Sequence, residues 1–254
     1  MSSDKSIEML CAIHEDTPRQ GPGSRSSTLR ALQMVPQLTR RESVLDIGCG
    51  TGAQALVLAE RMPRARITAV DIYRPFLDSL SERAAAAGLA GRIETRLGDM
   101  GALDDPPGSR DLIWAEGSAF VIGFEQALAA WRPLLRRGGV LGLSEVCWFV
   151  DEPPPEAAAA WQRWYPGIRP VAHRLEAVED AGYRLLGHFS LPSSDWTEEY
   201  FAPLDARLPA LREQFRDDPQ GLEVIEDTRY EHDLYREHEG VWGYEMIVAE
   251  RAGA

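Results

Sequence analysis

The chain alternates short apolar runs with longer stretches in which apolar residues recur every three or four positions. Five runs have the character of strands: residues 43–48, 66–71, 93–98, 111–116 and 139–146. Three stretches between them have the spacing of helices that bury one face: residues 53–62, 75–87 and 124–135. Strands that are apolar almost throughout and alternate with helices predict a parallel sheet covered on both faces.

The rhythm changes after residue 148. Residues 149–170 are rich in proline and aromatic residues, a further helix and strand follow, and residues 190–240 are mostly helical before a last strand within 241–254. Asp218 and Pro219 are placed to begin a helix of this insertion, because proline suits the first helical position. We therefore expect an α/β fold, a Rossmann-like doubly wound seven-stranded sheet with a helical insertion before the last strand, in a single domain.

The first predicted strand runs into the sequence VLDIGCGTGAQ, residues 44–54. Glycine costs conformational entropy, so three of them in five residues, Gly48, Gly50 and Gly52, require a geometric reason. In an open parallel sheet, ligands bind beyond the carboxyl ends of the strands. A glycine-rich turn at that place lets the backbone approach a ligand and begin the next helix.

Acidic residues near three predicted strand ends narrow the choice of ligand: Asp46, Asp71 and Asp99. A pyrophosphate disfavours a carboxylate at position 46, whereas an ammonium or sulfonium favours it. Asp71 can accept hydrogen bonds from ribose hydroxyls, and Asp99 can accept one from the exocyclic amine of adenine. The glycine spacing, G-x-G-x-G, also departs from the G-x-G-x-x-G of dinucleotide sites. The pattern favours a cationic nucleoside without phosphate, S-adenosyl-L-methionine (SAM).

Composition excludes several partners. With 27 basic and 40 acidic residues the net charge is −13, which disfavours binding to nucleic acid. No stretch approaches the roughly 20 apolar residues of a membrane span. The three cysteines have no C-x-x-C spacing and the N-terminus lacks a signal-peptide pattern, so the expected location is the cytoplasm. The five histidines show no pairing typical of metal ligands, and no metal is expected.

Several segments resemble a known family. Three segments resemble the first three motifs of class I SAM-dependent methyltransferases: VLDIGCGTGAQ, AVDIYRPFL and RLGDM. A fourth segment, WRPLLRRGGVLGLSE, resembles the stretch through the fifth strand of that family. Four further segments resemble a narrower group, the UbiE-like small-molecule methyltransferases of bacteria: RQGPGS (19–24), WAEG (114–117), SEVCWF (144–149) and WTEEYFAP (196–203). The resemblance implies a methyltransferase that converts SAM to S-adenosyl-L-homocysteine, acts on a small organic acceptor, and is a monomer or a homodimer.

The resemblance also assigns roles to matching positions. It implies that Asp46 faces the amino group of SAM, that Asp71 holds the ribose, and that Ile72 packs against the adenine. Arg25 is expected at the SAM carboxylate, and the backbone of Glu116 and Gly117 near the methyl group. The remaining positions expected to contact SAM are Gly48, Cys49, Gly50, Gly52, Gln54, Gly98, Asp99 and Met100.

By the same likeness the domain divides by function. Residues 1–40 form a helical lid, residues 41–148 the SAM-binding core, residues 149–170 and 190–240 the acceptor-side cover, and residues 241–254 the last strand. The acceptor is expected under the cover, in contact with His14, Trp148, Trp164, Tyr165, Trp196 and Tyr200. Each aromatic residue has ordinary core packing as its alternative, but together they predict an apolar pocket.

Two side chains are candidates for catalysis, Glu116 and His173. Glu116 either serves as a base or positions the backbone near the methyl group. Two other functions fit parts of the pattern. A nucleotide-dependent oxidoreductase on the same fold would need the dinucleotide glycine spacing and no acid at position 46, and a SAM-binding protein without catalysis would carry the same motifs.

Overall fold

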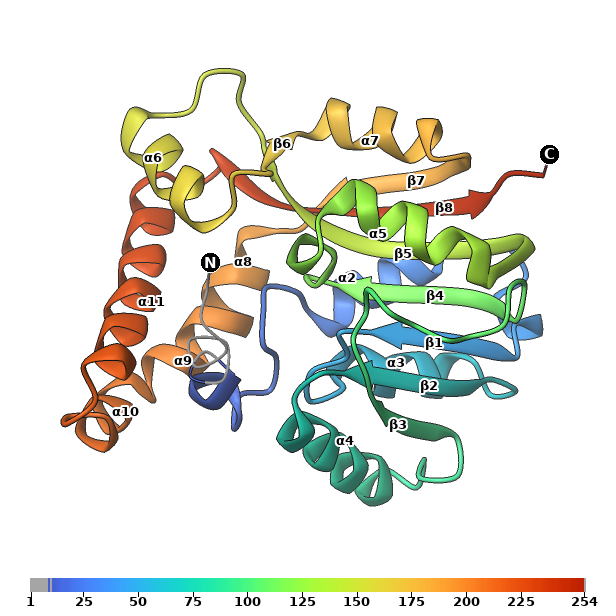
Figure 1. Ribbon diagram of the computed structural model, residues 1–254, viewed down its shortest axis with the longest axis horizontal. Coiled ribbons are helices and arrows are strands. Elements are labelled where there is room, and N and C mark those ends of the chain that lie inside the picture. The colour runs from blue at the N-terminus through green and yellow to red at the C-terminus, as the bar shows by residue number, and fades with distance from the viewer. Residues whose placement is uncertain (1–8, 10, 254) are drawn as a thin grey trace.

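The computed structural model describes residue 9 and residues 11–253 (Figure 1). One sheet has the strand order β3-β2-β1-β4-β5-β8-β7, and a further strand, β6, pairs with the end of β5. Strands β1 to β6 pair in parallel, whereas β8 is antiparallel to both β5 and β7. The strands span Ser43–Ile47 (β1), Arg66–Asp71 (β2), Ile93–Leu97 (β3), Arg110–Glu116 (β4), Leu135–Trp148 (β5), Arg169–Pro170 (β6), Tyr183–Ser190 (β7) and Trp242–Arg251 (β8).

The structure confirms the predicted doubly wound α/β sheet and differs from it in two strands. The two-residue β6 is additional to the expected seven. Strand β5 begins at Leu135 and not at residue 139, because the exposed Arg136 and Arg137 interrupt the apolar pattern of a segment that still pairs as a strand.

Helices cover both faces of the sheet and create two cores. In β4, Leu112 and Trp114 join one core, while Ile113 and Ala115 join the other, as the alternation of a strand requires. The first core contains residues of α2 (Arg25–Leu32), α3 (Ala53–Arg61) and α4 (Arg74–Ala86). The second contains residues of α5 (Phe124–Trp131) and α7 (Val171–Asp180). Short 3-10 turns are η1 (Leu38–Arg40), η2 (Ala119–Val121) and η3 (Arg132–Leu134).

A helical cover lies beyond the carboxyl ends of β1 and β4 (Figure 1). Its elements are α6 (Pro155–Trp164), α8 (Ser193–Trp196), a π-helical turn (η4, Thr197–Phe201), α9 (Ala202–Asp205), α10 (Leu208–Gln214) and α11 (Pro219–Glu237). Asp218 begins α11 as predicted, since its carboxylate accepts hydrogen bonds from the backbone N–H groups of Gln220 and Gly221. Among the described residues, no helix is both long and apolar enough to cross a membrane.

Candidate cofactor and acceptor site

The glycine-rich turn joins β1 to α3 at the carboxyl edge of the sheet. Gly48, Gly50 and Gly52 have φ of +67°, +54° and +82°, in the region that L side chains rarely adopt. A Cβ on Gly48 would lie 2.4 Å from that of Ser118, and a Cβ on Gly52 would lie 2.0 Å from Cδ1 of Leu80. The glycines therefore serve the left-handed turn and the close approach of neighbouring protein side chains.

Asp46 is fully buried in β1, directly before this turn. Its Oδ1 accepts a hydrogen bond from Nε2 of Gln54 at 3.2 Å, whereas Oδ2 has no partner in the described part of the chain. Burial raises the pKa of Asp46 well above its usual value, and the nearby carboxylate of Glu116 raises it further. A buried carboxylate oxygen without a donor is costly, and an ammonium group would satisfy it.

Asp71 ends β2 beside the same turn. Its Oδ2 accepts a hydrogen bond from the backbone N–H of Gly50 at 2.9 Å, and its Oδ1 accepts one from the N–H of Tyr73 at 3.0 Å. The next side chain, Ile72, is 65% exposed, which leaves a large apolar surface at the sheet edge. Asp71 thus fixes the glycine turn, and Ile72 offers an apolar platform beside it.

Gly98, Asp99 and Met100 follow β3. The N–H of Gly98 donates to the carbonyl of Asp71 at 3.0 Å, which continues the alignment of the two strands. Asp99 is exposed and accepts a hydrogen bond from the N–H of Gly101 at 2.8 Å. The carbonyl of the half-buried Met100 accepts one from the indole of Trp131 at 3.0 Å. The structure therefore brings Asp46, Asp71 and Asp99 to one edge of three neighbouring strands.

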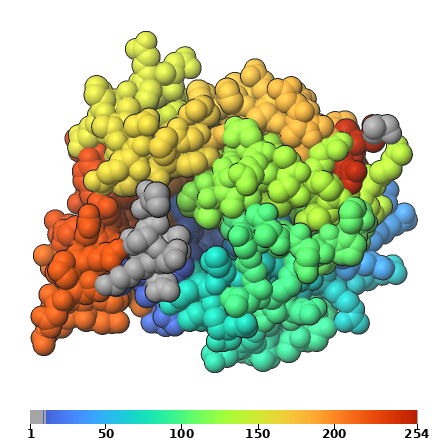
Figure 2. Space-filling model, viewed as in Figure 1, coloured from blue at the N-terminus to red at the C-terminus, as the bar shows by residue number. Residues whose placement is uncertain are grey.

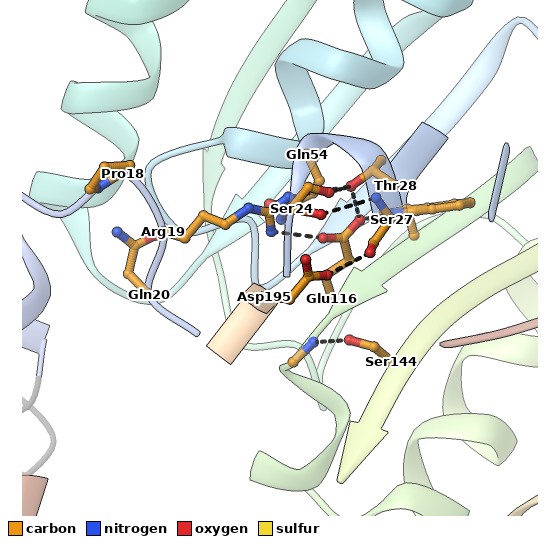
Figure 3. Close-up of polar contacts among 12 residues, drawn as sticks. Pro18, Arg19, Gln20, Ser24, Ser27, Thr28, Gln54, Glu116, Ser144 and Asp195 are labelled. Atoms are coloured by element: carbon orange, nitrogen blue, oxygen red, sulfur yellow. Dashed lines mark hydrogen bonds and ion pairs between the residues drawn. The ribbon is translucent and has the colours of Figure 1, made fainter. Parts of the chain in front are cut away.

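Glu116 is the last residue of β4. Asp46 pairs with Trp114 in the register, and Glu116 lies two residues after Trp114, so Glu116 and Asp46 are on the same face of the sheet. Its Oε2 accepts from Nη1 of Arg19 at 2.8 Å, and its Oε1 accepts from Oγ1 of Thr28 at 2.7 Å and from the indole of Trp114 at 2.8 Å (Figure 3). Both oxygens are engaged, so this candidate base anchors the N-terminal segment in the structure. A catalytic role for Glu116 stays a prediction.

The anchored segment, residues 17–28, is called the strap here. Within it, Oε1 of Gln20 accepts a hydrogen bond from the N–H of Thr51 at 2.8 Å and lies 2.1 Å from where a Cβ on Gly50 would be. Arg83 of α4 donates to the carbonyl of Thr51 at 2.7 Å. The strap therefore rests directly on the glycine turn, and α4 supports the turn from the side.

The strap also contacts the cover. Oγ of Ser27 donates to Oδ2 of Asp195 at 2.5 Å, and the N–H of Gly23 donates to the carbonyl of Asp195 at 3.3 Å. Asp195 comes from α8 and is 1% exposed (Figure 3). One short segment thus connects the glycine turn, the end of β4 and the cover.

Two predicted site residues point elsewhere. Arg25, expected at the SAM carboxylate, has a 57% exposed side chain that pairs with Glu60 of α3 at 2.5 Å. The arginine that turns inward is Arg19. His173 is exposed on α7, whereas its neighbour Arg174 is buried against Glu145 at 3.4 Å. Consecutive residues of a helix point to different sides. The buried side of α7 carries Arg174 and Val178, so His173 points away from the core.

Cys49 lies within the turn and is 2% exposed. Burial raises the pKa of its thiol well above the usual value, so the group stays protonated at neutral pH. Its position therefore suits a backbone contact and gives the sulfur no nucleophilic role. Gln54, from the first turn of α3, donates to the carbonyl of Cys49 at 3.2 Å and holds this backbone in place.

Three of the residues predicted to contact the acceptor, His14, Trp196 and Tyr200, are buried. Nε2 of His14 and Oη of Tyr200 lie 3.1 Å apart, and both side chains are buried. Trp196 stacks on Tyr235 with ring centroids 4.7 Å apart. Trp196 is only 1% exposed, which fits the alternative of core packing for this residue.

The other three are half-buried. Trp148 meets Trp161 edge to face at 6.5 Å between centroids, and Trp164 meets Trp161 at 5.5 Å. Oη of Tyr165 accepts a hydrogen bond from Arg174 at 3.2 Å. Trp148 ends β5, and Trp164 and Tyr165 lie at the end of α6; contact of these rings with an acceptor stays a prediction.

Two residues at this edge were missed by sequence reasoning. Oγ of Ser144 accepts a hydrogen bond from the N–H of Gly117 at 2.9 Å. A Cβ on Gly117, whose φ is +63°, would lie 3.2 Å from the ring of Tyr244. In the sequence Tyr244 is one more apolar residue of the last strand, and only the pairing of β8 with β5 brings it beside the turn after β4.

The space-filling view shows a hollow at this edge of the sheet (Figure 2). It lies beside the green segment and the cyan segment, and blue residues of the N-terminal part form its floor. Away from it, Glu156, Glu237 and His238 bring three possible metal ligands within 4.8 Å of one another, with both carboxylates exposed. Exposed acidic groups are common without an ion, and this group lies outside the site.

Known proteins share this architecture and its motifs. A family model described as a methyltransferase domain matches residues 44–139. The chain is 31% identical over 159 residues to demethylmenaquinone methyltransferase from Thermus thermophilus, an alignment that covers 61% of this chain and 67% of that protein. The chain belongs to the class I SAM-dependent methyltransferases. This membership confirms the enzyme class and the cofactor, SAM, that the sequence predicted.

Other likenesses of this methyltransferase are more partial or concern the fold alone. It is 36% identical over 114 residues to trans-aconitate 2-methyltransferase from Paracidovorax citrulli, and the alignment covers 44% of this chain and 41% of that protein. The chain thus spans less than half the length of some curated relatives that it matches. Its fold resembles a SAM-dependent methyltransferase from Geobacter sulfurreducens in complex with S-adenosyl-L-homocysteine, with a TM-score of 0.78, 20% identity, and coverage of 95% and 97% of the two chains.

Proposed function

We propose that this methyltransferase transfers the methyl group of SAM to a small organic acceptor that binds between the sheet edge and the helical cover. The observation that carries the proposal is the buried Oδ2 of Asp46, which has no partner in the described part of the chain. An uncompensated carboxylate beside the glycine turn disfavours a phosphorylated nucleotide and suits the amino group of SAM.

The residues around the turn fit the other parts of SAM. The backbone of Gly48, Cys49 and Gly50 lines the methionine portion, and Asp71 accepts hydrogen bonds from the ribose through lone pairs that its backbone partners leave free. Ile72 supplies an apolar surface for the adenine, and the exposed Asp99 accepts from its exocyclic amine. The proposed contacts with SAM also include four further residues: Gly52, Gln54, Gly98 and Met100. When bound, SAM supplies an electrophilic methyl group on a sulfonium.

The chain itself contributes orientation and exclusion of water. The strap joins Glu116, Thr51 and Asp195, three points around the turn, and so closes the cofactor side of the site. Holding two reactants in line accounts for about 7–11 kcal/mol of a barrier in favourable cases. We assign this role to the strap and the cover, with the backbone of Gly117 beside the reacting groups.

Turnover of isotopically labelled SAM with a library of small organic acceptors tests the proposal. We expect label in one class of acceptor together with formation of S-adenosyl-L-homocysteine, and loss of both in Asp46→Ala. Binding of SAM without transfer to any acceptor would favour a protein that binds and does not catalyse. Binding of NAD in place of SAM would favour an oxidoreductase.

We also propose that the protein works in the cytoplasm, without a nucleic-acid partner, as a monomer or a homodimer. Cysteines 11, 49 and 147 are all free, which suits a reducing compartment. The net charge of −13 supports the absence of a polyanionic partner.

A further inference from the structure

A half-buried carboxylate on the inner side of α11, that of Glu231, has no cationic partner among residues 9 and 11–253. Glu231 lies three residues after Thr228 and four before Tyr235, and both of these are buried on the face that α11 turns to the core. Within the described part of the chain, Glu231 makes no hydrogen bond or ion pair. Burial raises its pKa to about 7. A carboxylate in such surroundings costs free energy until a ligand or a proton compensates it.

Two phenols share the environment of Glu231. The ring of Tyr200 lies 5.9 Å from that of His232, the residue after Glu231. One turn after Glu231, Tyr235 stacks on Trp196, whose ring centroid lies 5.2 Å from that of Tyr244. Burial raises the pKa of Tyr200 and of Tyr244, and the charge of Glu231 raises both further. Tyr200 belongs to the π-helical turn of the cover, and Tyr244 lies with its ring against Gly117 at the end of β4. Groups from α11, the cover turn and the last strand therefore converge beside the place assigned to the methyl group.

The charges at this place favour a cation. A second carboxylate, Glu145, also raises the pKa of Tyr244, and Nη2 of Arg174 lies 3.4 Å from its Oε1. No such cation lies beside Glu231 in the part of the chain that the structure describes. The rings of Tyr244 and Trp196, with centroids 5.2 Å apart, add aromatic faces that attract positive charge. An anionic acceptor would meet repulsion from Glu231 and gain nothing from the rings.

From this convergence we propose that the acceptor is an organic amine whose ammonium group binds the carboxylate of Glu231 between Tyr200 and Tyr244. The inference rests on the proposed methyl transfer and adds the chemical class of the acceptor. Glu231 is a recognition residue in this account: it selects the amine and holds it beneath the cover.

Three matched probes test the class: phenethylamine, 2-phenylethanol and phenylacetate, which differ in charge but not in the phenyl group. Each is titrated by calorimetry into the protein saturated with S-adenosyl-L-homocysteine, for wild type, Glu231→Gln, Glu231→Asp and the control Glu223→Gln. Glu223 is on the same helix but exposed. In wild type and E223Q we expect the amine to bind about tenfold or more tightly than the alcohol. We expect E231Q to lose the preference for the amine and E231D to keep part of it.

Binding of S-adenosyl-L-homocysteine to each variant separates the two proposals. E231Q should bind it as wild type does, because Glu231 lies on the acceptor side. The inference is overturned if E231Q keeps the preference for the amine, if wild type prefers phenylacetate, or if no probe amine binds to protein that holds S-adenosyl-L-homocysteine. Failure of the wild type to bind S-adenosyl-L-homocysteine overturns the proposed function and this inference with it.

Discussion

Nη1 of Arg19 and Oε2 of Glu116 lie 2.8 Å apart at the end of β4, with side chains only 8% and 5% exposed. The two residues are 97 positions apart in sequence, so their ion pair fixes the strap to the sheet. Glu116 is also bonded to Thr28 and Trp114, which satisfies its remaining hydrogen-bonding capacity. An ion pair this well buried is costly to break by removing one partner, since the other charge stays behind.

Replacing Arg19 should therefore destabilise the protein far more than replacing an exposed arginine of the same segment. We expect Arg19→Ala to lower the free energy of unfolding by about 3 kcal/mol. The matched control is Arg25→Ala, whose exposed pair with Glu60 contributes less than about 1 kcal/mol. Urea unfolding of both variants measures the difference. Equal losses would show that the Arg19 pair does not anchor the strap.

Two glycines with similar backbone angles should respond differently to alanine. Gly52 and Gly88 have φ of +82° and +71°, so both variants bear the left-handed penalty of about 1 kcal/mol. Only Gly52→Ala also places a Cβ 2.0 Å from Leu80, which is fully buried. Overpacking there should cost about 1–3 kcal/mol more than in Gly88→Ala, as measured by thermal unfolding. A smaller loss in the first variant than in the second contradicts the packing of the turn.

Glu231 should make stability depend on pH. Its folded pKa of about 7 lies above the ordinary 4.5, so the folded state binds the proton more tightly and stability is lost as pH rises through this window. Between about pH 5 and about pH 8, wild type should lose about 1–2 kcal/mol relative to Glu231→Gln, a figure reduced for partial exposure. Glu223→Gln should follow wild type. Urea unfolding at both pH values checks this, and parallel curves for wild type and E231Q would exclude a buried charge.

Local sequence pattern was sufficient for most of the sheet. Strand β2 matches its predicted bounds, 66–71, and its apolar residues Ile67, Ala69 and Val70 are buried. The acids Asp46, Asp71 and Asp99 met at one edge because parallel strands end together there. The two-residue β6 could not be predicted, since Arg169 and Pro170 have no apolar pattern and are assigned to a strand only by pairing with Cys147 and Trp148.

The site was harder to predict where tertiary contacts decide orientation. Arg19 and Arg25 belong to one polar stretch, and nothing in its spacing indicates that Arg19 turns inward while Arg25 pairs with Glu60. Tyr244 and Glu231 reach the site only through the pairing of β8 and the packing of α11. A charge on an amphipathic helix is ordinarily assigned to the solvated face, so no local pattern indicates Glu231 as a site residue.

The central claim is that the carboxylates along the sheet edge bind an adenosyl compound that carries positive charge and no phosphate. Calorimetric titration of SAM into wild type, Asp71→Ala, Asp99→Ala and the control Asp104→Ala tests it most directly. The side chain of Asp104 is 94% exposed in the loop between β3 and β4, and its replacement should leave affinity unchanged. We predict binding to wild type, a loss of about tenfold or more in D71A and in D99A, and no binding of NAD. Wild-type affinity in both variants, or binding of NAD, would contradict the account.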